Sequence, residues 1–425
     1  MKLTVFRSEK GDCLLLTSRN GKRMLIDGGM EDSYEAHVAP ELSRMREANK
    51  KLDLVYVSHI DRDHISGVLR MLDDEAEWRV HEFQLANGNP GHPAPRSPRP
   101  PKVGGIWHNA FRDQVGNLAE RVEDSLAASA PLLLAADATG LRREGALQGM
   151  LAQSIPEALK VSRRIGAKQL NIPLNKQFAG KLATVEGIAQ PAKLGTVSLT
   201  LIGPFAADLT KLRTEWNTWL TTHGETVRSI QQRAERDEEA IGSSAVAWPA
   251  SQLIALGNEL GARSRVTTPN LASIMVLAEE GAKRILLTGD GHWKDILHGL
   301  ERRGKLDAEG KLHVEVLKVQ HHGSEHNIAR EFCDAVTADH YVFCGNGEHE
   351  NPDPRVVSLI AERRFAEGGD RPFTFWFNSH STVAETADGR DHMAESEALV
   401  GQLTQQSGGR LRAESLTGDS FEVAV

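Results

Sequence analysis

Two imidazoles and two carboxylates fall within six positions of this sequence, at His59, Asp61, Asp63 and His64. The apolar run at residues 52–57 predicts a buried strand before them, and residues 67–72 predict a helix after them. The side chains would then converge on a turn between the two elements. Neutral imidazoles with carboxylates are ligands for zinc, manganese or iron rather than calcium. A helix cap needs only one Asp, so we predict a metal site.

Two later motifs also place Asp and His directly after predicted strands. The strand at residues 284–288 precedes Asp290, and the strand at residues 313–319 precedes His321 and His322. In α/β enzymes the sheet is the scaffold, and the loops at one edge of it carry the chemistry. We therefore expect Asp290 and the adjacent histidines to lie beside the first motif.

The composition is ordinary for a soluble globular protein, with 425 residues, 40% of them hydrophobic, and a net charge of −8. This charge argues against a surface coated in basic residues, although not against a local basic groove. Cys13, Cys333 and Cys344 lack CxxC spacing, so we expect buried thiols in a reducing compartment. No secretory signal is visible, and the longest apolar run is too short to span a bilayer. These features predict a cytoplasmic protein with no membrane contact.

Apolar periodicity and turn residues divide the chain into alternating strands and helices. A β-meander is expected at residues 2–28 and an amphipathic helix at residues 34–50. Further strands are expected at residues 80–85, 196–202, 270–278, 284–288, 313–319, 340–344, 373–377 and 420–425. Gly, Pro and Asn at residues 87–105 indicate an inserted loop, and helical patterns occupy residues 112–181 and 206–240.

In chain order, the polar motifs are Glu9-Lys10-Gly11-Asp12-Cys13-Leu14, Ile26-Asp27-Gly28-Gly29, HxDxDH at residues 59–64, Asn270 with Ser273, Leu286-Leu287-Thr288-Gly289-Asp290, His321-His322-Gly323-Ser324, and Asn346-x-x-His349. Together they resemble the motifs of metallo-β-lactamase-fold hydrolases. Within that superfamily they are similar to the soluble hydrolase domain of the ComEC competence-protein family. The resemblance covers about residues 1–80, 196–205 and 266–378. Its most specific part is the metal motif followed by both downstream partners in order.

The resemblance implies an α/β fold, namely a four-layer αββα sandwich (the metallo-β-lactamase fold) with a helical insertion. Residues 1–86 and 196–425 would form the N-terminal and C-terminal halves of this domain. Residues 87–195 would form a loop and helical insertion that acts as a lid or a platform. The transmembrane channel of the family has no counterpart in this sequence, so the resemblance does not imply DNA uptake.

The resemblance also implies two divalent metal ions, with Zn²⁺ favoured and Mn²⁺ as the alternative. The implied ligands are His59, Asp61 and a histidine from the middle of the chain for the first ion; Asp63, His64 and His322 for the second; and Asp290 as the bridge. Asp61 stands where many relatives have His. Because a carboxylate is a harder ligand, it admits manganese as readily as zinc.

Two ligand positions stay open at this stage. The missing histidine of the first ion is His108 by preference, because it follows an apolar stretch in the right chain order, with His81 and His92 as alternatives. His321 can replace His322 as a ligand, or it can contact the ligands or the substrate.

The two ions would bridge a hydroxide that attacks the substrate at neutral pH. The catalytic candidates are Asp63, His321 and His349, because a histidine next to the metals can donate a proton to the leaving group. His349 is equally well explained as an ordinary loop residue. Asp12 and Asp27 are expected to form turns or to support the ligands from outside.

The resemblance favours a phosphodiesterase or nuclease, because this branch of the superfamily is associated with DNA degradation. Residues 141–182 add a basic segment, in which eight Lys and Arg less two Glu leave +6, and such a segment would attract nucleic acid. Phe178 is its only aromatic residue, so it offers no stacking platform for bases. A metallohydrolase of small esters, lactones or phosphorylated metabolites is one alternative, and a module that binds a protein partner is another.

Overall fold

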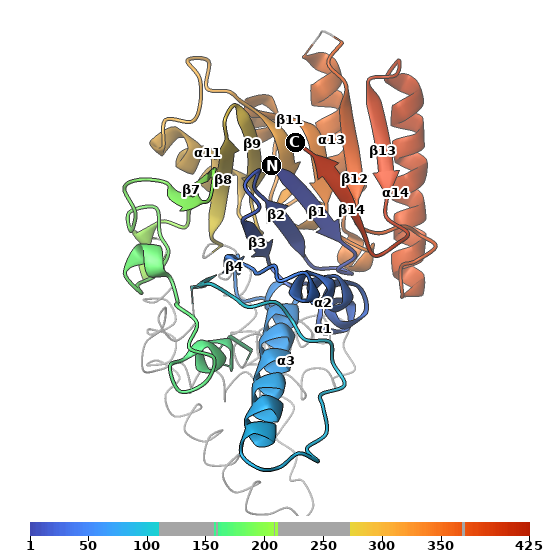
Figure 1. Ribbon diagram of the computed structural model, residues 1–425. Coiled ribbons are helices and arrows are strands. Elements are labelled where there is room, and N and C mark those ends of the chain that lie inside the picture. The colour runs from blue at the N-terminus through green and yellow to red at the C-terminus, as the bar shows by residue number, and fades with distance from the viewer. Residues whose placement is uncertain (110–156, 159, 208, 211–272, 368–369) are drawn as a thin grey trace, which may run out of the picture.

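The computed structural model describes residues 1–109, 157–158, 160–207, 209–210, 273–367 and 370–425 (Figure 1). The first of its two sheets has the strand order β14-β1-β2-β3-β4-β5. Its strands are β1 (Lys2–Phe6), β2 (Leu14–Thr17), β3 (Arg23–Ile26), β4 (Leu54–Tyr56), β5 (Ile106–Trp107) and β14 (Ser420–Ala424). Strands β14, β1, β2 and β3 pair antiparallel, as expected for the predicted meander, and β3, β4 and β5 pair parallel.

The second sheet has the order β13-β12-β11-β10-β9-β8-β7-β6. Its strands are β6 (Ala192–Leu194), β7 (Val197–Gly203), β8 (Met275–Glu280), β9 (Lys283–Leu287), β10 (Leu312–Lys318), β11 (Val336–Phe343), β12 (Phe373–Phe377) and β13 (Leu411–Ser415). The strands from β9 to β13 run parallel, and those from β6 to β9 pair antiparallel. Parallel neighbours end at the same edge, so β9 and β10 deliver their following loops to one place.

Helices cover the outer face of each sheet. The first sheet carries α1 (Glu31–Ser33), the π-helical turn Tyr34–Val38, α2 (Ala39–Glu47) and α3 (Arg62–Ala86), and the second carries α11 (Trp293–Arg302), α12 (Arg330–Ala335), α13 (Pro354–Ala366) and α14 (Ala387–Gln406). Buried apolar side chains form one core under each helical layer and a third core between the sheets. Three cores separate four layers, which confirms the predicted α/β sandwich.

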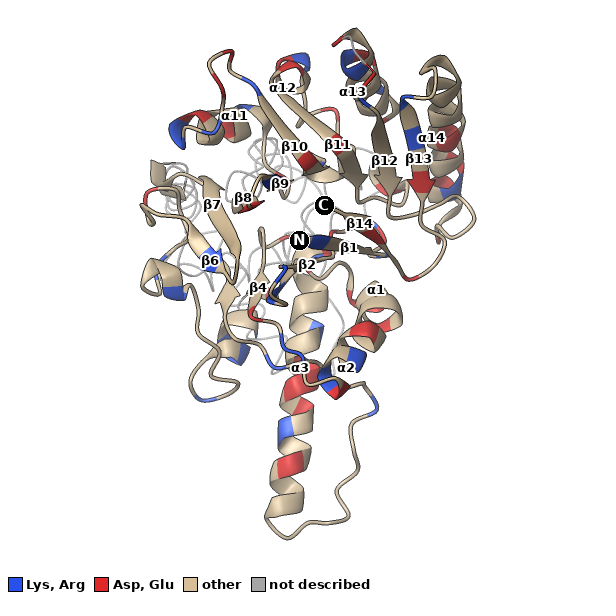
Figure 2. Cartoon of the chain, turned by 45° about the horizontal axis from the view of Figure 1, so that its top comes forward, with Lys and Arg blue, Asp and Glu red and all other residues tan. Residues whose placement is uncertain are grey.

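The strand predicted at residues 80–85 is wrong, because these residues form the C-terminal part of α3. No Gly or Pro interrupts residues 68–86, so nothing stops the helix that begins at Arg62. The alternating apolar pattern that suggested a strand does not reflect burial, since Val80, Phe83 and Leu85 are exposed. Figures 1 and 2 show this end of α3 projecting beyond the sheets.

Other expectations fall partly outside the described residues. Residues 160–165 are helical, as predicted, but the predicted helix does not continue to residue 181. Gly166 and Pro173 interrupt it, and residues 166–181 form turns, a bridge and the short 3-10 helix Lys176–Phe178. Residues 110–156 and 211–272 lie outside the described ranges. Cys13, Cys333 and Cys344 are buried free thiols, as expected. Among the helices of the described ranges, none combines the length and the apolar character needed to cross a membrane.

A glycine contact fixes the start of α3 against the loop after β3. The Gly28 amide donates to the His64 carbonyl at 2.8 Å, and the Gly67 amide donates to the Gly29 carbonyl at 3.1 Å. A Cβ on Gly67 would lie 2.1 Å from the Gly28 carbonyl oxygen, which is inside van der Waals contact. Only glycine therefore allows α3 to bring His64 to the sheet at this crossing.

We expect Gly67→Ala to lower the free energy of unfolding by at least about 1–3 kcal/mol, because the added methyl group forces backbone apart. Chemical denaturation of the purified protein measures this change. Gly401→Ala is the matched control, since a Cβ there meets nothing within 4 Å and should stabilise α14 by about 0.4–1 kcal/mol. Equal stability of the two variants would contradict the packing described here.

Candidate metal centre

The carboxylate of Asp290 lies at the centre of the candidate site, and histidine rings face it from both sheets. His64 Nε2 lies 3.4 Å from Asp290 Oδ1, and the Nε2 atoms of His59, His322 and His321 lie 3.6, 3.5 and 3.7 Å from Asp290 Oδ2. His59 follows β4 and His64 lies in the first turn of α3, whereas Asp290 follows β9 and the other histidines follow β10. The site therefore joins the two halves of the sandwich.

Two further carboxylates lie against the same ring nitrogens. Asp61 Oδ2 is 3.4 Å from His59 Nε2, and Asp63 Oδ2 is 3.0 Å from His322 Nε2 and 3.7 Å from His64 Nε2. Asp61 is the N-cap residue of α3 and Asp63 lies in its first turn. The partial positive charge of a helix N-terminus stabilises carboxylates at these positions.

The second nitrogen of each ring is held by an oxygen atom on the far side. The Nδ1 contacts are Ser58 Oγ at 3.0 Å for His59, Asp27 Oδ2 at 3.0 Å for His64, Asn327 Oδ1 at 2.7 Å for His321, and the Cys344 carbonyl at 2.6 Å for His322. With the proton on Nδ1, each Nε2 keeps its lone pair for a metal ion. Asp27 thus contacts a ligand candidate, His64, on the side of the ring that faces away from Asp290.

His321 and His322 are adjacent in sequence, yet both rings reach Asp290. Their φ angles are 47° and 55°, in the left-handed region that few residues other than glycine adopt. Strained backbone of this kind is held in place by its surroundings and is concentrated at functional sites. The tight turn after β10 therefore gives two ligand candidates instead of one.

The spacing of these atoms fits metal ions. Two ligands bound at 2.0–2.1 Å to one tetrahedral ion lie about 3.4 Å apart, and most of the N···O distances above are 3.4–3.7 Å. Within the described part of the chain, His59 Nε2, His64 Nε2, His322 Nε2 and Asp290 Oδ1 are buried without a hydrogen-bond partner. Buried polar atoms are rarely left unpaired, and a bound cation would satisfy them.

The electrostatic potential of the site favours cations. Burial opposes the charged form of His64, but Asp290 and Asp63 outweigh it and raise the pKa of the imidazole well above its usual value. Burial likewise opposes ionisation of Asp290, but His322 and His64 outweigh it and hold the pKa of that carboxyl well below its usual value. The carboxylates therefore stay ionised at neutral pH, and the site attracts positive charge.

The site opens to solvent on one side. The side chains of His59, His64 and Asp290 are at most 3% exposed, whereas those of Asp61, Asp63 and His321 are 29, 23 and 27% exposed. The ligand candidates at the centre of the site are therefore buried, and those at its edge are partly exposed to solvent.

The structure does not bring His108 into this cluster through any contact among the described residues. His108 follows β5, which pairs with β4, so its backbone lies at the same sheet edge as His59. Both of its ring nitrogens are buried without a described hydrogen-bond partner, and burial alone lowers its pKa to about 4. The alternatives His81, on α3, and His92, in the loop after it, contact each other, with the Nδ1 atoms 3.3 Å apart. The role of His108 stays a prediction.

His349 lies in the loop that follows β11. It occupies an exposed turn at Glu348–Glu350 with a φ of 56°. Burial and the charge of Lys10 lower its pKa, while Asp63 acts in the opposite direction. Among the described residues no hydrogen bond or ion pair joins His349 to the ligand candidates, so its catalytic role stays a prediction.

Sequence reasoning missed Lys318, which is buried next to the site. Its Nζ donates to the Gly289 carbonyl at 3.0 Å, pairs with Asp12 and lies 3.7 Å from Asp290 Oδ1. A lysine in a strand whose neighbours are apolar requires a buried acidic partner, and that was the signal available in the sequence of β10. Asp12, His64, Asp290 and His322 form a group with ligand atoms within 4.8 Å of one another.

Comparison with known families agrees with this geometry. Residues 9–114 match the family model of the metallo-beta-lactamase superfamily, and this interval holds Asp12, Asp27 and the HxDxDH motif. No curated protein matches the chain. Over residues 9–114 the chain is similar to this superfamily, whose members are typically metal-dependent hydrolases, and the two mixed sheets are consistent with its sandwich fold. The family model does not distinguish the ComEC-like branch.

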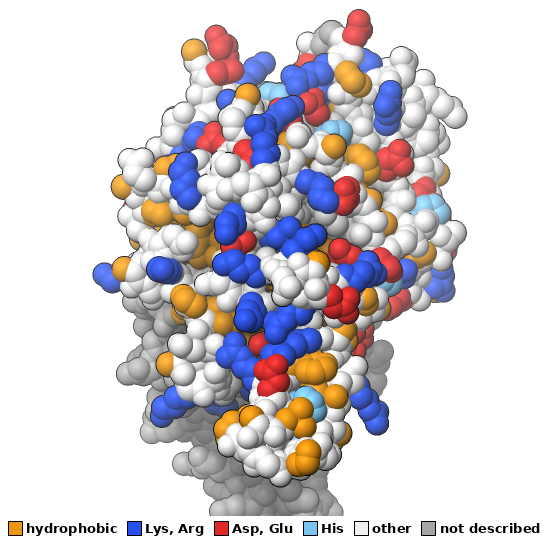
Figure 3. All heavy atoms as spheres, in the orientation of Figure 1, with side chains coloured by type: hydrophobic (Ala, Val, Ile, Leu, Met, Phe, Trp, Pro, Cys, Tyr) orange, Lys and Arg blue, Asp and Glu red, His pale blue; other side chains and the backbone are white. Residues whose placement is uncertain are grey.

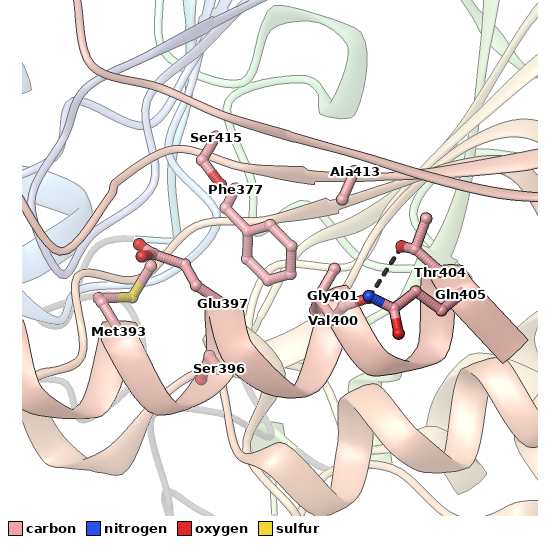
Figure 4. A pocket seen from close by; sticks show the side chains of 10 residues that line it. All are labelled: Phe377, Met393, Ser396, Glu397, Val400, Gly401, Thr404, Gln405, Ala413 and Ser415. Carbon is pink, nitrogen blue, oxygen red and sulfur yellow. Dashed lines mark hydrogen bonds between the residues drawn. The ribbon is translucent and has the colours of Figure 1, made fainter.

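A separate cavity of about 390 Å³ lies between α14 and strands β12 and β13 (Figure 4). Phe377, Met393 and Val400 give it an apolar wall. Its carboxylate, Glu397, accepts hydrogen bonds from the amide and hydroxyl of Ser381 at 2.7 and 2.8 Å. This cavity brings together no group of metal ligands, so we do not place the reaction there.

We expect purified wild-type protein to bind two divalent ions per chain and Asp290→Ala to bind less than one, because Asp290 is the carboxylate shared by the histidines. Elemental analysis after dialysis against Zn²⁺ or Mn²⁺ measures the content. At a metal concentration of 100 times Kd, each bound ion should stabilise the wild type by about 2.7 kcal/mol. Fewer than one ion in the wild type, unchanged in Asp290→Ala, would contradict the assignment.

Proposed function

We propose that this protein is a two-metal phosphodiesterase whose substrate is a nucleic acid. The observation that carries the metal part is the arrangement around Asp290, where one carboxylate faces ring nitrogens from two sheets. The substrate part is supported by the ComEC-like motifs and by a basic pocket beside α3.

The proposed ligands follow from the N···O distances. They are His59, Asp61 and His321 for one ion and Asp63, His64 and His322 for the other, with Asp290 shared. In this proposal His321 takes the place that the sequence favoured for His108. Each group has the mixed histidine and carboxylate character that both zinc and manganese accept.

When bound, such ions supply a nucleophile from water at neutral pH and polarise the scissile phosphoryl oxygen. The protein contributes the remaining steps. Hydrogen bonds from Nδ1 hold the histidine rings in orientation, and the partly exposed face at Asp61 and Asp63 admits the phosphodiester. His349 is the proposed proton carrier: burial lowers its pKa, so its neutral ring can accept a proton from water and return it to the leaving group.

The basic pocket has a volume of about 380 Å³ and is lined by Asp73, Lys160, Arg163, Arg164 and Gln169. Arg164 pairs with Asp73 of α3 and donates to Gln169. Within the described residues, Lys160 and Arg163 have no carboxylate at ion-pair distance. Two uncompensated cations in one pocket fit an anionic group such as a backbone phosphate.

The pocket and the metal centre lie along one helix. Glu157 accepts from Ser66 at 3.0 Å in the second turn of α3, and Arg164 reaches Asp73 two turns later. The distance from His64 to Asp73 is roughly 14 Å along the helix axis at 1.5 Å per residue. Nine residues also turn the helix by about 180°, so a strand of a few nucleotides would pass partly around α3 to place flanking phosphates in the pocket and one phosphodiester at the metals.

The net charge of −8 does not exclude this substrate. On the face drawn in Figure 3, Lys and Arg side chains gather over the central and lower parts, interleaved with Asp and Glu. Nucleic-acid binding depends on such local distributions of charge more than on the total.

We expect wild-type protein loaded with Mn²⁺ or Zn²⁺ to cleave linear DNA or RNA and the generic substrate bis(4-nitrophenyl) phosphate. Chelation should abolish both activities, and Asp290→Ala should be inactive under all conditions. Gel assays and absorbance at the nitrophenolate band measure the two reactions. If metal-loaded protein cleaves no phosphodiester but opens a lactone, the small-ester alternative replaces this proposal.

We expect Lys160→Ala/Arg163→Ala to weaken nucleic-acid binding and to reduce the slope of log K against log salt by about 1.4–1.8, because two phosphate contacts are lost. Fluorescence anisotropy with a labelled oligonucleotide at several salt concentrations measures this slope. Turnover of bis(4-nitrophenyl) phosphate should not change.

The matched control is Lys311→Ala/Arg412→Ala, which removes one exposed Lys and one exposed Arg remote from α3. It should leave the salt dependence unchanged. Equal effects of the two double variants would show that total charge, and not the pocket, governs binding.

A further inference from the structure

Asp12 lies behind two of the proposed metal ligands. It faces the Nδ1 atoms of His322 and His64, with O···N distances of 3.3 and 3.8 Å. Asp290 faces the Nε2 atoms of the same rings. Because the two nitrogens of an imidazole point in different directions, a metal ion on Nε2 lies on the side of Asp290, away from Asp12. Asp12 is close enough to His64, Asp290 and His322 to be counted among the ligands. It lies at the Nδ1 side of the two rings, however, whereas the proposed ions lie at the Nε2 side.

Lys318 connects this outer carboxylate with the inner one. Its side chain is 2% exposed, and Nζ pairs with Asp12 while lying 3.7 Å from Asp290 Oδ1. The Gly289 carbonyl accepts a third contact at 3.0 Å. The ammonium group therefore lies between Asp12 and Asp290. Its positive charge acts on any cation that binds at Asp290.

We propose that Lys318 is a positioning residue whose buried ion pair with Asp12 sets the charge of the metal centre and leaves Asp290 as the carboxylate that the two ions share. This inference rests on the two-metal site proposed above. Lys318 offsets the charge of one carboxylate and places its positive charge 3.7 Å from Oδ1 of Asp290. Asp12 keeps Lys318 in place, and its Oδ1 lies 3.3 Å from the Nδ1 atom of His322, which donates to the Cys344 carbonyl.

The proposal predicts opposite effects of two single substitutions. Lys318→Met removes a cation next to the ions, so Zn²⁺ affinity should rise about tenfold or more. Asp12→Asn leaves the Lys318 charge uncompensated, so affinity should fall about tenfold or more, as for other groups that support ligands. Asp12→Asn should still bind two ions at saturation, and the visible spectrum of its Co²⁺ form should match the wild type. Asp290→Asn, the matched control, should change both.

The double variant Asp12→Asn/Lys318→Met distinguishes an effect of charge on Zn²⁺ affinity from an effect of misfolding. It removes one charge of each sign, so its Zn²⁺ affinity should return to within about threefold of the wild type. It also tests the proposal if Lys318→Met does not fold without metal, because the double variant leaves no unpaired buried charge. Competition against a chelator measures affinity, and thermal unfolding with and without Zn²⁺ measures folding.

Three results would overturn the proposal. They are a loss of metal ions in Asp12→Asn equal to that in Asp290→Asn, a folded Lys318→Met with unchanged or weaker affinity, and a double variant with strongly weakened affinity. If the wild type itself binds no metal, the two-metal site fails instead, so the two failures are distinguishable.

Discussion

The structure depends on the convergence of four imidazole Nε2 atoms on the single carboxylate of Asp290, at distances of 3.4–3.7 Å. Two of these histidines belong to the first sheet and two to the second, so the contact is made only when the halves of the sandwich pack correctly. Carboxylates and imidazoles buried together carry a high desolvation cost unless a cation binds there. The fold therefore supplies a rigid site, and a bound metal would in turn hold the two sheets together.

The orientation of the four imidazole rings is set by residues that are not themselves proposed ligands. Ser58, Asp27, Asn327 and the Cys344 carbonyl each hold one Nδ1 atom, and Lys318 with Asp12 adds a buried ion pair. These partners come from segments far apart in sequence. Their positions depend in turn on the glycine crossing between the loop after β3 and the first turn of α3. The geometry of the site is thus a property of the whole sandwich, and not of the HxDxDH motif alone.

Local patterns predicted much of this architecture. The HxDxDH motif and the strand ends at Asp290 and His321 could be placed because apolar runs followed by polar turns mark strand ends. Two adjacent histidines could not be assigned from sequence, since only the left-handed backbone of residues 321 and 322 lets both rings point the same way. The helical character of residues 80–85 was missed because their apolar side chains suggested a buried strand, whereas Val80, Phe83 and Leu85 are exposed on the helix. Lys318 was missed because its partners, Asp12 and Asp290, are distant in sequence.

The central claim is that two metal ions share Asp290. Crystals grown with Mn²⁺ or Zn²⁺ and measured at the absorption edge of the metal test it directly. The account predicts two anomalous peaks about 3.5–4 Å apart on either side of the Asp290 carboxylate, one next to His59 and His321 and the other next to His64 and His322. A single peak, or peaks that do not contact Asp290, would contradict it.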